Sequence, residues 1–147
     1  MSRSALRRVR AEIARTEQHR RRVEGRALRY GRQYDVAWDC KVHATYAMWR
    51  HEDACAELKS EEKRILASTP EDSRALARAR SEVQLAGIRA SVARRWAWRR
   101  QCAEDRAWRR NYRVDQARFA VQDALERLRS EERRLVETLE HAPRRTP

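Results

Sequence analysis

A repeat with a period of seventy residues organises the chain. Residues 2–66 align with residues 72–136 without gaps at 18 identities in 65 pairs, whereas chance predicts roughly a tenth for such a composition. The strongest match joins residues 58–66 to residues 128–136, around a shared Ser-Glu-Glu. Seventy residues make ten heptads, so both copies keep the same register of a coiled coil. The repeat therefore predicts two long and equivalent helices.

Each copy carries a stripe at alternating steps of three and four residues, which keeps one helix face toward a partner helix. The predicted seam positions of the first copy are Leu6, Val9, Ile13, Thr16, Arg20, Val23, Ala27, Tyr30, Tyr34, Ala37, Lys41, Ala44, Met48, His51, Cys55, Leu58, Glu62 and Ile65. Those of the second copy are Leu76, Ala79, Val83, Ala86, Ala90, Ala93, Ala97, Arg100, Glu104, Ala107, Asn111, Val114, Arg118, Val121, Leu125, Leu128, Glu132 and Leu135. The charged members must pair or reach solvent, because an unpaired buried charge is costly.

The second copy also has another apolar line beside its alanine-rich stripe. This second line predicts a local drift of the seam, as a stutter in the heptads would produce. Its residues are Leu85, Ile88, Val92 and Trp96.

The only clear breaker in the interior of the chain is the segment 68–73, which contains Pro70. It predicts a helix over 4–67, a turn at 68–70 and a helix over 70–141, with Thr69 as the N-cap. Residues 142–147 are expected to be a disordered basic tail. Since a short connection makes successive helices antiparallel, we expect one all-α domain over 1–147, a long two-helix antiparallel coiled-coil hairpin. Residue i would then lie opposite roughly residue 140 − i.

The sequence contains no motif of an enzyme or a cofactor site. Glycine-rich phosphate loops, HExxH, GxSxG and EF-hand patterns are all absent, so we expect no enzyme, no cofactor and no catalytic residue. His51 and Cys55 have the i, i+4 spacing of metal ligands, but both lie on the seam without a second pair, which favours packing over metal binding. Cys40 and Cys102 would lie close together across the hairpin, where oxidation could join them by chance.

Three cysteines without a signal peptide or a transmembrane segment predict free thiols and a cytoplasmic protein.

Positive charge is concentrated at the open end of the predicted hairpin. The chain has a net charge of +13, and residues 1–34 hold eleven arginines against three glutamates. Residues 107–147 hold ten arginines against seven acidic residues, whereas the tip, 52–88, holds six cations against eight acidic residues. Such asymmetry predicts an acidic partner, which could be a protein pore, nucleic acid or a membrane surface. The candidate partner-binding residues are Arg7, Arg8, Arg10, Arg15, Arg20, Arg21, Arg22, Arg127, Arg129, Arg133 and Arg134.

All ten aromatic residues fall within residues 30–49 and 96–119, which would largely face each other in a hairpin. The rings could fill a local widening of the seam, or some could point outward as an interface, since a two-helix seam cannot bury so many. The two interpretations are compatible. Trp96 and Trp98 cannot both face the seam, because they are two residues apart on a helix. The candidate interface residues are Tyr30, Tyr34, Trp38, Trp49, Trp96, Trp98 and Trp108.

Tyr30 and Tyr34 form a Tyr-x3-Tyr element in the first predicted helix. Together with the basic hairpin pattern and the central proline turn, this element resembles the stalk proteins of type III secretion and flagellar export ATPases, the FliJ/YscO class. The resemblance implies a stalk peripheral to a membrane export apparatus. Its open end, 1–34 and 107–141, would bind the pore of a hexameric secretion ATPase, and its tip, 52–88, would approach an export-gate protein.

Two other interpretations stay open. A basic coiled coil with stackable rings could bind nucleic acid. Two copies could instead form a homodimeric scaffold, a four-helix bundle with the aromatic rings in its core.

Overall fold

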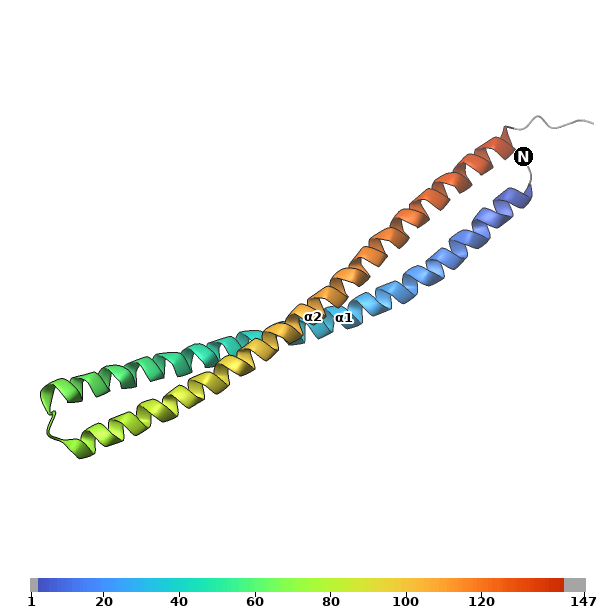
Figure 1. Cartoon of the computed structure of the whole chain (residues 1–147). Helices are drawn as coiled ribbons and strands as arrows, with labels where there is room; N and C mark the ends of the chain where they lie inside the picture. The colour runs from blue at the N-terminus through green and yellow to red at the C-terminus, as the bar shows by residue number, and fades with distance from the viewer. Residues whose placement is uncertain (1–2, 142–147) are drawn as a thin grey trace, which may run out of the picture. The chain divides into compact units, whose positions relative to one another are not determined.

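The computed structural model describes residues 3–141, which form two long helices joined by a short turn (Figure 1). Helix α1 runs over Arg3–Ser68 and helix α2 over Ser73–Glu140. The two helices pack against each other and no strand occurs among residues 3–141, so the prediction of an all-α helical hairpin is confirmed. The predicted tail, 142–147, lies outside the described residues.

The turn ends α1 and caps α2 with different residues. Thr69 closes α1, since both its amide and its hydroxyl donate to the carbonyl oxygen of Ile65. Asp72 caps α2, because its Oδ1 accepts the Ala75 amide at 3.0 Å and its carbonyl accepts the Leu76 amide. The prediction of a helix from residue 70 with Thr69 as its N-cap is therefore wrong. Aspartate is the stronger cap, and the Thr69 hydroxyl is engaged with the preceding helix.

We expect Asp72→Ala to lower the free energy of unfolding by about 1 kcal/mol, because the Ala75 amide loses its acceptor. Urea denaturation followed by circular dichroism measures this change. Asp72→Asn, which keeps an acceptor, and Glu71→Ala, which removes an acidic side chain next to the cap, should each stay within about 0.5 kcal/mol. Equal losses in Asp72→Ala and Glu71→Ala would argue against the cap.

The chain divides into two compact units, each built from a segment of α1 beside a segment of α2. We call them the terminal unit, described over 3–32 and 109–141, and the turn unit, Gln33–Trp108.

In the terminal unit the two segments run antiparallel. Arg10 Nε lies 2.7 Å from Glu132 Oε1, and Arg129 Nη2 lies 2.9 Å from Glu17 Oε1. The residue numbers of these two pairs add up to 142 and 146, so opposite residues lie above the predicted sum of 140. The later start of α2 accounts for the difference, since it moves every residue of α2 along by the same amount.

The core of the terminal unit is a cluster of Val23, Val121 and Leu125, against which Ile13 and Val114 pack while partly buried. Leu125 is fully buried and is the largest side chain in that state among the described residues. A core of this size buries little apolar area, so each of its members matters.

The seam of the turn unit consists mostly of alanines, of which Ala44 and Ala90 are essentially inaccessible to solvent. Small side chains let the helix backbones approach closely. The second apolar line of α2 is not part of the seam, and the predicted drift is wrong. Two helices bury only one stripe each, so a second stripe has no surface to pack on. The exposed fractions of this line are 55% for Leu85, 55% for Ile88, 61% for Val92 and 39% for Trp96.

Every buried residue within 3–141 belongs to the predicted stripes. These residues are Val9, Val23, Ala44, Cys55, Ala79, Ala86, Ala90, Ala93, Ala97, Glu104, Val121, Leu125 and Leu135. Three stripe members are nevertheless exposed, namely His51, Arg100 and Arg118. The period of the stripe was therefore sufficient to identify the buried face of both helices, and its polar members account for the exceptions.

Candidate interaction surfaces

The predicted partner-binding arginines all lie in the terminal unit, and all except the half-buried Arg20 are exposed. They are unequally divided between the helices. Residues 3–32 of α1 carry eleven arginines against three glutamates, whereas residues 109–141 of α2 carry eight arginines against seven acidic residues. The net positive charge of this unit therefore comes almost entirely from α1.

Several of these arginines are paired within the unit. Arg10 and Arg129 join the two helices through glutamates, and Arg20 lies 3.6 Å from Glu24 on its own helix. Arg133 donates to the Ser130 hydroxyl at 3.3 Å. The remaining predicted arginines have no ion pair within the described chain, which leaves their guanidinium groups available to a partner: Arg7, Arg8, Arg15, Arg21, Arg22, Arg127 and Arg134.

The tryptophans of the predicted aromatic interface lie at the surface. In the turn unit the exposed fractions are 45% for Trp38, 50% for Trp49, 68% for Trp98 and 50% for Trp108. Tyr34 in the turn unit and Tyr30 in the terminal unit are half-buried. The tryptophans therefore do not fill the seam as large core residues would, and neither Trp96 nor Trp98 is buried in it.

Some rings are held by neighbours on the same helix. Tyr46 and Trp49 meet edge to face at 5.5 Å. The Lys41 ammonium lies 4.9 Å from the centre of the Trp38 ring, and the Arg100 guanidinium lies 5.8 Å from that of Trp96. Aromatic rings that are exposed yet ordered beside arginine resemble the composition of protein-binding hot spots.

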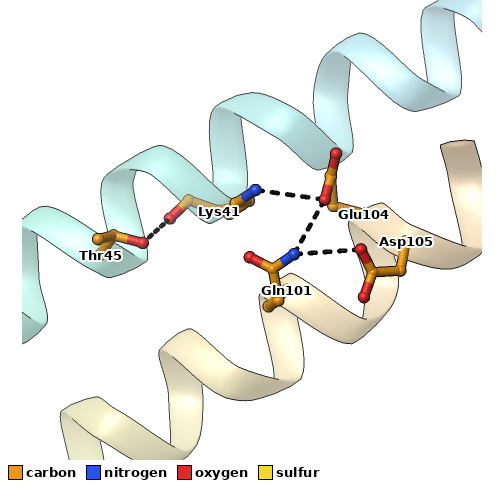
Figure 2. Close-up of polar contacts among 5 residues, drawn as sticks. All are labelled: Lys41, Thr45, Gln101, Glu104 and Asp105. Atoms are coloured by element: carbon orange, nitrogen blue, oxygen red, sulfur yellow. Dashed lines mark hydrogen bonds and ion pairs between the residues drawn. The ribbon is translucent and has the colours of Figure 1, made fainter.

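A polar layer crosses the seam of the turn unit (Figure 2). Lys41 Nζ on α1 lies 3.3 Å from Glu104 Oε2 on α2, and Glu104 is 6% exposed. Gln101 donates to Glu104 at 3.3 Å and to Asp105 Oδ1 at 3.1 Å. A single buried polar pair in a coiled coil fixes the alignment of its helices, at some cost in stability.

An apolar groove runs along one side of the turn unit. One hollow, of about 340 Å³, is lined by Ala47, His51, Ile88, Arg89, Val92, Ala93 and Trp96. A second, of about 310 Å³, is lined by Val36, Asp39, Cys40, His43 and Trp96. Trp96 belongs to both hollows, so they adjoin. We call the combined surface the turn-unit groove.

The sequence pattern did not predict this groove. Its α2 wall was visible as the second apolar line, but that line was assigned to the seam. Its α1 wall also has the spacing of a helix face, at Val36, Cys40, His43, Ala47 and His51, and could have been found from that spacing.

Within the described range the structure shows no cluster of three metal ligands, and the three cysteines are free. Among residues 3–141 no group of three His, Cys, Asp or Glu side chains could hold a metal ion. Cys55 is buried in the seam, whereas His51 faces the groove, so the expected packing of both on the seam is wrong for His51. Cys40 and Cys102 are free and half-buried. Neither α1 nor α2 includes a segment long and apolar enough to cross a membrane.

Comparison of the chain with protein-family models, with curated proteins and with solved structures gave no match.

Proposed function

We propose that the protein is a non-catalytic coiled-coil adaptor whose basic terminal unit binds an acidic protein partner. The observation that carries this proposal is the surface of α1 over residues 3–32, which contains eleven arginines and only three glutamates. Most of the candidate guanidinium groups there have no ion pair in the described chain. Charge of this density attracts an acidic surface and accelerates its encounter with the protein.

In its particular form, the proposal is the one implied by the resemblance to export-ATPase stalks. The terminal unit binds the pore of a hexameric type III secretion ATPase and promotes its assembly and activity, while the turn unit is directed to an export-gate protein. The long helices and the basic α1 segment support this form, because a basic surface is attracted to an acidic pore.

The test is binding to a purified hexameric type III export ATPase, measured by size-exclusion chromatography and by the rate of ATP hydrolysis. The triple variant Arg8→Glu, Arg15→Glu, Arg22→Glu should weaken binding at least about tenfold. The exposed arginines attract an acidic partner and match its charges, and the glutamates would repel it. Lys59→Glu, Arg74→Glu, Arg78→Glu makes the same charge change in the turn unit and should leave binding of the ATPase pore unchanged.

Nucleic acid is the alternative acidic partner, favoured by the exposed tryptophans beside arginine. Titration against double-stranded DNA and single-stranded RNA at several salt concentrations separates the two. Submicromolar affinity that falls steeply with salt, without stimulation of the ATPase, would contradict the proposed function.

A further inference from the structure

The turn unit leaves one apolar line of its α2 segment uncovered. Its α2 segment carries two apolar lines, of which the alanine line packs on α1 and the line at Leu85, Ile88, Val92 and Trp96 is exposed. A helix with two apolar faces is expected where it contacts two neighbours, because each neighbour covers one face. The α1 wall of the groove adds a matching row, which includes Val36 and Ala47.

The residues that line the groove have the spacing and the apolar character of a site for a helix. Two adjoining hollows lie between α1 and α2, and their walls repeat at three and four residues along both helices. An amphipathic helix presents its own apolar residues at the same steps, so its side chains can enter successive hollows. Trp96, which lines both, occupies the centre, where hot-spot aromatics are usually found.

The charges around the groove indicate which kind of helix would bind there. Residues 83–103 of α2 contain five arginines and no acidic residue. Arg94 pairs with Glu52 at 3.0 Å, while Arg89 and Arg95 are exposed beside the apolar line. The opposite wall, residues 35–51, is neutral overall. A second copy that docked through the same groove would therefore bring a neutral wall and a basic wall against these arginines, whereas an acidic helix matches them.

We propose that the turn-unit groove binds an acidic amphipathic helix of a protein partner, which completes a three-helix bundle. This site is separate from the basic surface of the terminal unit, so the failure of either proposal leaves the other standing. The predicted aromatic interface is partly included, since Trp96 lies in the groove, whereas Trp49 and Trp98 do not line it.

The test uses the full chain and three labelled helical peptides, with binding measured by fluorescence anisotropy. The first peptide has leucines at heptad positions a and d and glutamates on its flanks. The second keeps the leucines and carries lysines instead, and the third is a scramble of the first. The acidic peptide should bind at least about tenfold more tightly than either of the others.

Ile88→Ser, Val92→Ser should weaken binding of the acidic peptide at least about tenfold without loss of helicity, because both side chains are more than half exposed in the free protein. Leu28→Ser, at a residue of the terminal unit that is 67% exposed, is the matched control and should bind normally. Arg89→Glu, Arg95→Glu should reduce the preference for the acidic over the lysine peptide.

Absence of binding by the acidic peptide, or equal binding of the scramble, would overturn the proposal. Analytical ultracentrifugation and vesicle flotation test the other occupants. Dimerisation that Ile88→Ser, Val92→Ser abolishes would assign the groove to a second copy, and binding to anionic vesicles that it abolishes would assign the groove to a lipid surface. Either result would overturn the assignment to a partner helix.

Discussion

Leu125→Ala is expected to lower the free energy of unfolding by about 3 kcal/mol, which is the largest effect that we predict for a single substitution. The side chain is 0% exposed and packs with Val23 and Val121 in the core of the terminal unit. Truncation removes its buried methyl groups and leaves a cavity. Because the unit has only two helix segments, few other side chains can move in to fill that cavity.

Urea denaturation followed by circular dichroism measures this loss, and amide hydrogen exchange locates it. Protection should fall first in the terminal unit, over 3–32 and 109–141. Leu28→Ala removes the same atoms from a side chain that is 67% exposed, and should change stability by less than about 0.5 kcal/mol. Similar losses from both variants would contradict the assignment of the core to this cluster.

The second large effect concerns the polar layer of the turn unit. Glu104→Leu should destabilise the protein by about 2 kcal/mol, because the half-buried Lys41 ammonium loses its carboxylate. Lys41→Leu should also destabilise it, since Glu104 is the more deeply buried of the two. The double variant should regain most of the loss, because an apolar pair no longer has to be desolvated as charges.

A double-mutant cycle gives the coupling energy between the two side chains. The pair of Arg10 and Glu132 is the matched comparison, as it also joins the two helices, but the Arg10 side chain is 61% exposed. Its coupling should be below about 1 kcal/mol, since solvent screens it. If the two cycles gave equal coupling energies, burial would not be the reason for the strength of the Lys41–Glu104 pair.

The double variant should also lose specificity of alignment. Leucines at both positions can pack in more than one register, whereas the Lys41–Glu104 contact is satisfied in only one. Heteronuclear NMR should show additional or broadened signals for residues near Gln101 in the double variant. A single sharp set of signals would indicate that the alanine seam is enough to fix the register.

The sequence predicted the seam well because burial on a helix follows a simple period. Spacing alone places Ala44 and Leu125 on the stripes, and both are 0% exposed in the described part of the chain. The same spacing was wrong for His51, since position on a stripe does not decide whether a polar ring is covered.

The candidate surfaces were predicted less completely. The excess of arginine in residues 1–34 was visible from composition, but the pairing of Arg10 with Glu132 and of Arg129 with Glu17 depends on which residues lie opposite each other. That alignment depends on where α2 begins. A difference of three residues at the turn changes every contact between the helices.

By itself, the sequence determined that the chain forms two long helices, which face of each is buried, and which segment is basic, since these follow from period and composition. Only the tertiary structure decided that Asp72 caps α2, that Lys41 meets Glu104, and that the seam of α2 stays on its alanine line instead of drifting to the second apolar line. The last choice leaves Ile88 and Val92 exposed. Its physical reason is that two stripes on one helix compete for a single partner, and local periodicity does not show whether the seam leaves one stripe for the other.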